Sequence, residues 1–440
     1  MNCLVSIGEA VDKLSILELK LKKINNLDKQ AEIKKEIEAL NACNKYKSEF
    51  EFYYKLLFYV NEQIWDLTDK IKNMSVIDLD FSKIANDIFE YNQKRFRVKN
   101  WINLSSTSDI KEQKSYAASY CKIIIQTEEL IFSKIPEINF LLLEYDMVFF
   151  DCSHISTIKT IFKNPTIIYN TDKYPSNVFE YDISTFNIPN NIKKTFEFCP
   201  ITYINGGRLG DFLQSLSVVC ETFYNSGKKG ILLISDKGDI FKNGIKNTYD
   251  DTYNILINQK YIYDYKIYNG EKYSVDLTTW RNYERIIANT NWYIIYGIFY
   301  NIEWGKHKWI NVETNSLLYG NKVFINTTDY RWPNIDFNLI YNKYGNDLVF
   351  LNTDFDLKQY SIFVEKTGLN IPYISVSTFS EMCCAIASCK LFIGGLSAPL
   401  TVAHAIHKDR IIGLLRSVHN EDTIRNSGLE SIWNNVRYSV

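Results

Sequence analysis

Two glycine-bearing stretches of the sequence hold the residues best suited to chemistry. Residues 201–219 read ITYINGGRLGDFLQSLSVV, and residues 389–406 read CKLFIGGLSAPLTVAHAI. Each begins with an apolar segment typical of a β-strand, continues through small residues, and ends in a segment typical of a helix. Because the first backbone N–H groups of a helix have no partner inside it, such a turn favours the binding of a phosphate or another anion. Two copies indicate two nucleotide-binding halves with a cleft between them.

The second stretch has the composition of an anion-binding turn. Its small residues let a ligand approach the backbone closely, and Pro399 suits the first turn of a helix, which we expect to begin near Leu400. The Ser397 hydroxyl can add a hydrogen bond. The candidate ligand contacts are therefore Gly394, Gly395, Ser397, Ala398, Pro399 and Leu400. An ordinary turn between a strand and a helix has a similar composition, so the loop alone does not decide between the two interpretations.

The first stretch places a carboxylate at the start of its helix. Asp211 follows Gly210, and we expect its side chain to face the cleft; in the alternative interpretation it only caps the helix. The nearby glycines favour the functional interpretation, because a cap does not need them. Gly207, Arg208 and Gly210 are candidate acceptor or cleft contacts.

Predicted strands alternate with helical segments from residue 199 onward. Strands separated by helices are typical of parallel βαβ units and a doubly wound sheet. A break near 311–321 divides this part into two halves, 199–315 and 316–440. The sequence therefore predicts an α/β fold with two Rossmann-like domains, the GT-B architecture. The predicted strands are residues 201–204, 230–235, 322–326, 348–352, 373–376, 390–393 and 411–415.

Residues 1–133 predict an all-α helical bundle. Apolar residues recur at steps of three and four from Ile7 to Ile24, the spacing of one helical face, and Ser6 with Glu9 matches a capping box. This heptad-like stripe predicts a homo-oligomer assembled through the N-terminal helices. Further helices are expected through Ile33 and Leu40 and at 49–72, 82–102 and 109–133.

Residues 134–198 form a transition between the bundle and the later domains. The segments 140–150 and 165–171 predict strands, and 154–162 predicts a helix between them. These residues form either a small α/β insert or the edge of the next domain, and the sequence leaves both open.

The N-terminal residues resemble an uncharacterised family of small helical bacterial proteins, which is often found beside, or fused to, machinery for surface glycans. The resemblance rests on SIGEAVDKLSILELKLKKI near the start, VNEQIWDLTDKIK at 60–72 and RFRVKNWINLSSTSDIKEQKSY at 95–116. It implies no activity, so the expected role of the bundle is oligomerisation or docking.

Residues from about 200 to 420 resemble family 9 glycosyltransferases, the heptosyltransferase-like group. Gly210-Asp211 looks like the GD motif that opens these enzymes, and FIGGLSAPLTVAHAIHKDRI resembles the nucleotide-sugar loop near their end. VDLTTWRNYERI at 275–286 and VFINTTDYRWPNIDF at 323–337 resemble related bacterial and phage members. The resemblance implies an inverting, metal-independent transfer in which Asp211 is the general base for the acceptor hydroxyl. The half at 199–315 would then be the acceptor side and the half at 316–440 the nucleotide-sugar side, with the second loop holding the donor diphosphate.

The same resemblance suggests further contacts. Thr327, Thr328 and Arg331 follow a strand where a GT-B enzyme often gathers donor phosphate, and an Arg fork can bind a diphosphate at two points. A lone Arg after a strand is also commonly a surface cation. Asp276 and Arg281 are expected on the acceptor side of the cleft.

The chain departs from the heptosyltransferases at two positions of the donor loop. Leu396 and Thr401 stand where those enzymes carry an Asp and a His. The departure puts a heptose donor in doubt but not the fold, and the donor is expected to be another nucleotide sugar.

Several patterns that resemble metal sites are better explained otherwise. The triplet Asp354-Phe355-Asp356 matches a DxD sequence but lacks the surroundings of a metal-dependent transferase. His404 and His407 are spaced to share a helical face, but no third ligand is near in sequence. The nine cysteines show no CxxC pair and indicate free thiols in a reducing compartment. We expect no metal and no other cofactor.

Composition limits the function classes. A net charge of −1 argues against a nucleic-acid-binding protein, which needs unbalanced Lys and Arg. No run reaches the roughly 18 apolar residues that span a bilayer, and the first residues lack a basic region followed by an apolar one. These features predict a soluble, cytoplasmic protein of 440 residues with several domains.

Three functions fit the sequence. The first is a glycosyltransferase that moves a sugar from a nucleotide sugar to a glycan or related acceptor. The second is a non-catalytic scaffold that binds a sugar nucleotide or glycan, in which the two departures mark lost activity. The third is a nucleotide-sugar epimerase or hydrolase on the same fold.

Overall fold

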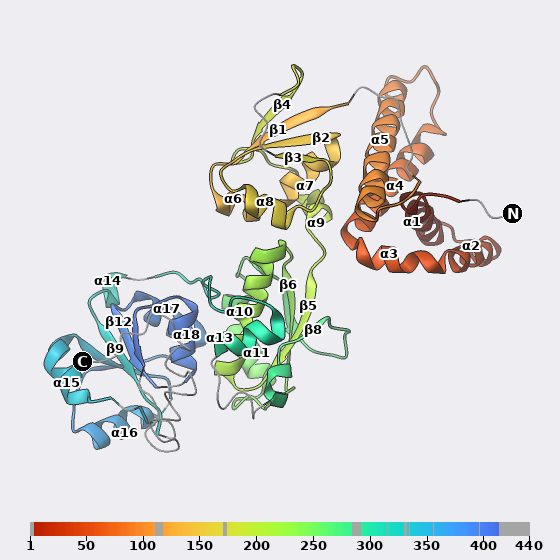
Figure 1. The fold of residues 1–440 in the computed structure, drawn as a ribbon. Helices are drawn as coiled ribbons and strands as arrows, with labels where there is room; N and C mark the ends of the chain where they lie inside the picture. Colours follow the sequence, from red (N-terminus) through yellow and green to blue (C-terminus); the bar gives the residue numbers. More distant parts are fainter. Residues whose placement is uncertain are drawn as a thin grey trace. The chain divides into compact units, whose positions relative to one another are not determined.

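The computed structural model describes residues 4–110, 118–169, 174–283, 292–314, 316–329, 332–333, 335–354, 356–395 and 397–412. The chain divides into two compact units, residues 1–199 and 200–440. Each unit is described by itself (Figure 1). No helix in the described ranges combines the length and the apolar character that crossing a bilayer requires.

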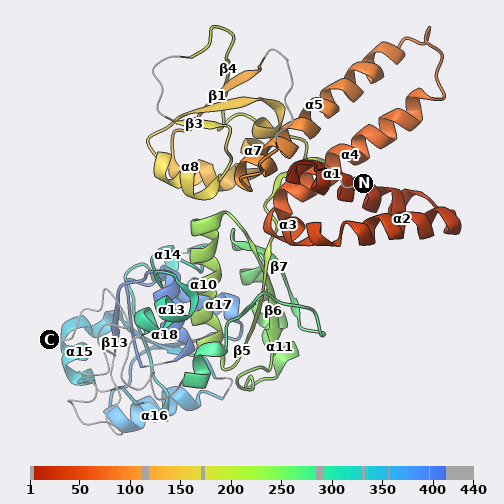
Figure 2. The same cartoon turned by 45° about the vertical axis from the view of Figure 1, so that its right-hand side comes forward.

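The first unit begins with a helical bundle, as expected. Its helices are α1 (Ile7–Lys23), α2 (Leu27–Ala39), α3 (Asn44–Glu49), α4 (Glu51–Ile71) and α5 (Phe81–Ser105), with a 3-10 turn at Asn41–Cys43. Helices α4 and α5 form a long antiparallel hairpin (Figure 2), and α1 packs against both. The α1 stripe lies in this contact, where Val11, Leu14 and Leu17 are fully or almost fully buried. The stripe is thus already used within one chain, and oligomerisation through these helices stays a prediction.

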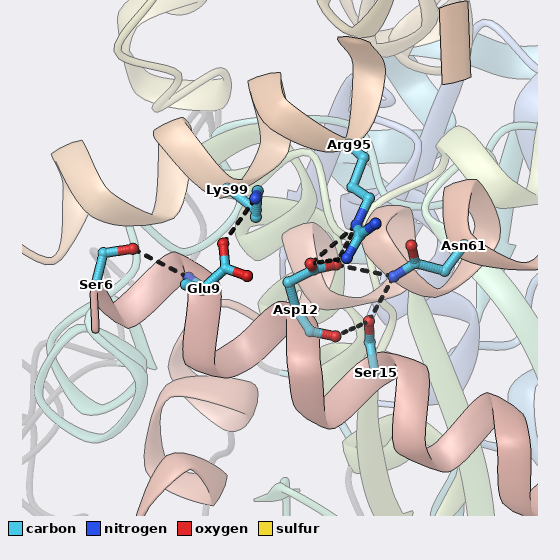
Figure 3. A network of polar contacts seen from close by, with 7 residues as sticks. All are labelled: Ser6, Glu9, Asp12, Ser15, Asn61, Arg95 and Lys99. Carbon is cyan, nitrogen blue, oxygen red and sulfur yellow. Dashed lines mark hydrogen bonds and ion pairs between the residues drawn. The ribbon is translucent and has the colours of Figure 1, made fainter. Parts of the chain in front are cut away.

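Polar residues join α1 to the hairpin (Figure 3). The Asp12 carboxylate, which is completely buried, accepts hydrogen bonds from the Arg95 guanidinium and from Asn61 Nδ2. Ser6 caps α1 by accepting from Glu9 N, but the Glu9 side chain pairs with Lys99 Nζ at 2.7 Å. The polar positions of the SIGEAVDKLS segment therefore have internal partners in the bundle.

A four-stranded parallel sheet completes the first unit. Its order is β3-β2-β1-β4, with β1 (Tyr120–Ile124), β2 (Met147–Asp151), β3 (Ile167–Tyr169) and β4 (Phe179–Asp182). The surrounding helices are α6 (Glu128–Ser133), α7 (Ile135–Glu144), α8 (Ile155–Ile161) and α9 (Asn190–Phe196). The helix predicted in 154–162 and the strand predicted in 165–171 are confirmed.

Two expectations for residues 109–150 are wrong in part. A helix was expected at 109–133, but residues 120–124 form β1, in which Cys121 and Ile123 are buried while Lys122 pairs with Glu180. Alternation of buried and exposed side chains is typical of a strand. Because it extends over only five residues, it is hard to detect inside the longer window over which a helical pattern is recognised. The run 140–150 was expected to be a strand; residues 147–150 do belong to β2, but residues 140–144 form the end of helix α7. A continuous apolar run does not distinguish a buried helix from a buried strand.

The second unit contains two parallel sheets. The first has the order β7-β6-β5-β8 and the second the order β11-β10-β9-β12-β13. Strand β5 is Ile201–Gly206, β6 Gly230–Ser235, β7 Ile262–Ile267 and β8 Val275–Asp276. In the second sheet, β9 is Val323–Asn326, β10 Leu348–Asn352, β11 Tyr373–Ser375, β12 Leu391–Gly394 and β13 Arg410–Ile412. The α/β class, the two Rossmann-like sheets and the preceding helical bundle are confirmed.

Helices cover both sheets of the second unit. Those of the first sheet are α10 (Leu209–Ser226), α11 (Ile245–Leu256) and α13 (Trp292–Tyr300), with a 3-10 helix at Thr279–Tyr283. Those of the second are α14 (Ser316–Tyr319), α15 (Phe337–Tyr344), α16 (Lys358–Thr367), α17 (Phe379–Ser388) and α18 (Ala398–Ala405). The central strands β5, β6, β9, β10 and β12 are mostly apolar and buried because helices pack on both faces, whereas β7 and β11 at the sheet edges have exposed residues.

Two tryptophans connect the sheets. Trp304 Nε1 donates to Gln214 O at 3.2 Å and Trp309 Nε1 donates to Leu213 O at 2.8 Å, so the segment between the sheets is fixed to α10. The Trp304 ring also stacks on His404 of α18, with 4.8 Å between ring centroids. Helices α10 and α18 pack against each other. These are the helices that follow the two glycine-bearing turns.

Candidate functional site

Both sheets of the second unit reverse their strand order beside their first strand. In the first sheet the reversal lies between β5 and β8, and in the second between β9 and β12. The carboxyl ends of parallel strands at such a point are where open α/β sheets bind ligands. The glycine-bearing turns follow β5 and β12, so both candidate stretches lie at switch points.

The turn after β5 needs its glycines. A Cβ at Gly206 would lie 2.4 Å from the carbonyl oxygens of Ser235 and Lys237. Gly207 has a φ of +97°, and a Cβ there would lie 2.2 Å from Arg281 Nη2. The side chain of Asn205, which is buried, supports the turn by accepting from Gly206 N and donating to Phe212 O.

Asp211 is not a helix cap. Arg208 occupies the N-cap position of α10, and Asp211 lies in the first helical turn. Its carboxylate accepts a hydrogen bond from Arg281 Nη2 at 2.8 Å. Within the described ranges this bond to Oδ2 is its only hydrogen bond, and the Asp211 side chain is 29% exposed. The capping alternative is therefore wrong, and one carboxylate oxygen is left for a ligand.

Arg281 lies behind that carboxylate in a closely fitted slot. Its guanidinium stacks on the Trp280 ring, 4.8 Å from the ring centroid. Gly207 closes one side, and Gly238, with a φ of +89°, closes another, because a Cβ there would lie 3.0 Å from Arg281 Cδ. The Arg281 Nε atom is buried and has no hydrogen-bond partner among the described residues.

Two further ion pairs lie beside Asp211 and Arg281. Arg208 Nε donates to Asp239 at 3.0 Å, and Lys237 Nζ contacts Asp276 at 2.6 Å. Burial opposes ionisation of Asp276, but hydrogen bonds from Lys237 and from Thr278 outweigh it and lower the pKa of Asp276. The predicted residues Gly207, Arg208, Asp211, Asp276 and Arg281 thus all belong to one edge of the first sheet.

The loop after β6 supplies residues that the sequence reasoning missed. These are Lys237, Gly238 and Asp239, which pair with or pack against the predicted residues. The sequence does contain a pattern that could have indicated them: a polar run with a glycine follows the apolar strand β6 and therefore lies at the same edge of the sheet.

The second turn joins β12 to α18. Ser397 is the N-cap of α18, but its side chain makes no capping bond; its Oγ donates to Gly395 O at 3.2 Å. The helix begins at Ala398, two residues earlier than expected, with Pro399 in the first turn. Leu400 is completely buried, so its side chain packs in the core and only its backbone can contact a ligand. Leu396 lies outside the described residues.

The two turns meet. A Cβ at Gly210 would lie 3.6 Å from Ala398 N and 3.6 Å from Thr401 Oγ1. The amino ends of α10 and α18 are therefore adjacent, and each carries the partial positive charge of a helix N-terminus. Thr401 is buried at this contact and donates back to Ser397 O at 3.3 Å. The sequence predicted a cleft between the two halves, and the structure places the two turns next to each other.

The two threonines after β9 differ in how far their side chains are buried. Thr327 is 1% exposed, and its hydroxyl has no partner in the described part of the chain. Thr328 is half-buried. Asn326, at the carboxyl end of β9, donates to Leu351 O and fixes the neighbouring strand. Arg331 lies outside the described residues, and its predicted contact with donor phosphate stays a prediction.

The metal-like patterns have structural explanations. His404 is 4% exposed, stacks on Trp304 and accepts from Arg410 Nη2; burial lowers its pKa well below the usual range. His407 contacts Gly305 O. Asp356 accepts from Lys358 N at 3.2 Å, as at the start of a helix. The described residues contain no group of three or more His, Cys, Asp or Glu that could hold a metal ion.

Comparison with known proteins gives only distant likenesses. No protein-family model matches the chain, and no curated protein is similar to it in sequence. Among solved structures, it is similar to a family 9 glycosyl transferase from Veillonella parvula, with 10% identity, 68% of this chain and 81% of that chain covered, and a TM-score of 0.21. It is also similar to E. coli heptosyltransferase WaaC with ADP-2-deoxy-2-fluoro heptose, with 9% identity, 66% and 88% covered, and a TM-score of 0.21. At these TM-scores, the interpretation of the site depends on its own geometry.

Proposed function

We propose that this chain is a glycosyltransferase that moves a sugar from a nucleoside diphosphate sugar to a hydroxyl of a glycan or related acceptor. One observation carries the proposal. The amino ends of α10 and α18, each at a switch point of its sheet, meet beside the ion pair of Asp211 and Arg281. A base and an anion-binding end are then within reach of one substrate.

The chemistry assigned to the site is an inverting displacement. The acceptor oxygen forms a bond to the anomeric carbon on the face opposite the leaving group. The bond from that carbon to the diphosphate breaks, and its electron pair leaves with the diphosphate. Asp211 takes the acceptor proton through Oδ1, the oxygen that Arg281 does not hold.

The leaving diphosphate is assigned to the amino end of α18. Backbone N–H groups of its first turn and the Ser397 hydroxyl can donate to the diphosphate as its charge develops. Because Gly395 has no side chain, a phosphate can approach the backbone of the turn closely, whereas the missing side chain of Gly394 makes room for Phe392 and Asn326 O. The proposal needs no metal ion, since the helix end supplies positive potential.

A donor screen tests this proposal. The purified chain is incubated with UDP-, GDP-, ADP- and dTDP-linked sugars, with and without a mixture of oligosaccharide acceptors, and released nucleotide and product are measured by mass spectrometry. We expect one donor class to be consumed only when acceptor is present. Consumption without acceptor, giving free sugar or an isomer, would favour the hydrolase or epimerase. Binding without any turnover would favour the scaffold.

A further inference from the structure

Arg281 holds Asp211 through only half of the bond pattern that an arginine can make. A guanidinium commonly binds a carboxylate by two parallel bonds, from Nε and from one terminal nitrogen. Here Nη2 donates to Asp211 Oδ2 at 2.8 Å, while Nε is buried without a hydrogen-bond partner among the described residues. The second bond is missing although the two groups are in contact.

The slot explains why Nε does not bind a ligand either. Cβ positions at Gly207 and Gly238 would both lie 3.3 Å from Nε, so the two backbones cover this atom. The Arg281 side chain is 17% exposed and that of Asp211 is 29% exposed. The arginine is therefore the rear member of the pair, and the carboxylate is the member that faces the site.

Both slot glycines have a positive φ, in two loops that are distant in sequence. Glycine raises the entropic cost of folding, so two such positions around one guanidinium need a reason. Here any side chain at Gly207 would displace Arg281, because its Cβ would lie 2.2 Å from Nη2. The backbone of this sheet edge is shaped to keep Arg281 where it is.

We propose that Arg281 is a positioning residue for Asp211. It fixes Oδ2 and thereby turns Oδ1 toward the acceptor hydroxyl. This role rests on the proposed function, because it presupposes that Asp211 accepts the proton. Arg281 touches neither substrate in this scheme and acts only through the carboxylate.

A double-mutant cycle tests the proposal on the full chain. We expect Arg281→Gln to lower kcat by about 100-fold, the order expected from misplacing a reacting group by about 1 Å, with both KM values changed by less than about threefold. On the Asp211→Asn background, the same change should have almost no further effect on the residual rate. Arg281→Lys should recover part of kcat, because an ammonium can bind Oδ2 but cannot fill the slot.

A pair of glycine variants tests the position of Arg281 without removing its positive charge. Gly207→Ala should lower kcat as Arg281→Gln does, because its methyl displaces the guanidinium. Gly270→Ala is the matched control: φ at Gly270 is +84°, but nothing lies within 4 Å of its Cβ position. Both variants strain the backbone, and only the first contacts Arg281. Thermal unfolding of every variant checks that the compared chains are folded.

The possible failures are distinguishable. A raised donor KM with unchanged kcat in Arg281→Gln would make Arg281 a donor contact and overturn the inference. An equal loss of kcat with and without Asp211 would also overturn it. Equal kcat in Gly207→Ala and Gly270→Ala would show that the slot is not needed. If the unaltered chain transfers no sugar from any donor, the proposed function fails, and the positioning role fails with it.

Discussion

The described residues form four arginine–aspartate pairs, and the three whose arginine is mostly buried occur in two settings. In the first unit, Arg95 binds the buried Asp12 through both Nε and Nη2, and Arg97 binds Asp146 through Nε at 2.7 Å and Nη2 at 3.4 Å. In the second unit, Arg281 binds Asp211 through Nη2 alone. In the first two pairs, two nitrogens of the arginine bind the carboxylate, an arrangement called here a complete fork. In the third pair only one nitrogen binds it, which makes a half fork, and this pair lies where two helix ends meet.

The difference separates two uses of the same residue types. In a complete fork both carboxylate oxygens have partners, so the pair suits a structural link and has little left for a ligand. In the pair at the site, one oxygen of Asp211 accepts no hydrogen bond from the described residues. The two kinds of pair should respond differently to mutation: loss of a complete fork should affect stability, and loss of the half fork should affect activity.

The largest effect is expected for Asp211→Asn. General base catalysis contributes about 10² to 10⁴ in rate, so kcat should fall by roughly 10³. The side chain is partly exposed and its amide can still accept from Arg281, so the free energy of unfolding should change by less than about 1 kcal/mol. Steady-state transfer assays and urea unfolding measure the two quantities. Undiminished turnover would remove Asp211 from the mechanism.

Asp12→Ala should show the opposite pattern. It leaves Arg95 without its carboxylate in a site where Asp12 is completely buried, and loss of one partner of a buried pair costs about 3–5 kcal/mol. Urea unfolding should show this loss in the first unit. Glu9→Gln is the matched control: it removes the neighbouring pair with Lys99, but the Glu9 side chain is 46% exposed. Its cost should stay below about 1 kcal/mol. Equal costs would mean that burial does not distinguish these pairs.

The sequence predicted the parts of this comparison that are local. Strand, turn and helix around Asp211 follow from neighbouring residues, so β5 and α10 were predicted within a few positions. The slot was not predictable, because Gly238 and Arg281 meet only when β6 and β8 lie on either side of β5. Strand β1 was missed for the same reason: its five residues become a strand by pairing with β2 and β4. Arg281 was predicted as a cleft residue, but nothing near it in sequence indicates Asp211 as its partner.

The Asp146 fork should make the first unit sensitive to acid. Burial of Asp146 opposes ionisation, but hydrogen bonds from Arg97 and Ser119 outweigh it, so its folded-state pKa is lowered. A carboxyl with a lowered folded pKa stabilises the fold above its unfolded pKa of about 4, and this stability is lost as the pH falls through the folded pKa. Unfolding free energies measured between about pH 6 and pH 3 should decline less steeply in Asp146→Asn than in the unaltered chain. Parallel curves would show that this pair does not contribute.

The smallest effect is expected for Lys237→Gln, which removes a pair beside the half fork. Lys237 Nζ contacts Asp276 at 2.6 Å, but the lysine side chain is 42% exposed, and exposed pairs contribute about 0–1 kcal/mol. Urea unfolding should therefore change little, and kcat should fall far less than in Arg281→Gln, because no bond to Asp211 is lost. This variant separates two explanations of the site. If any cation at this sheet edge supports transfer by its charge alone, Lys237→Gln and Arg281→Gln should lose similar activity. If the single bond to Oδ2 is what matters, only the arginine variant should lose it.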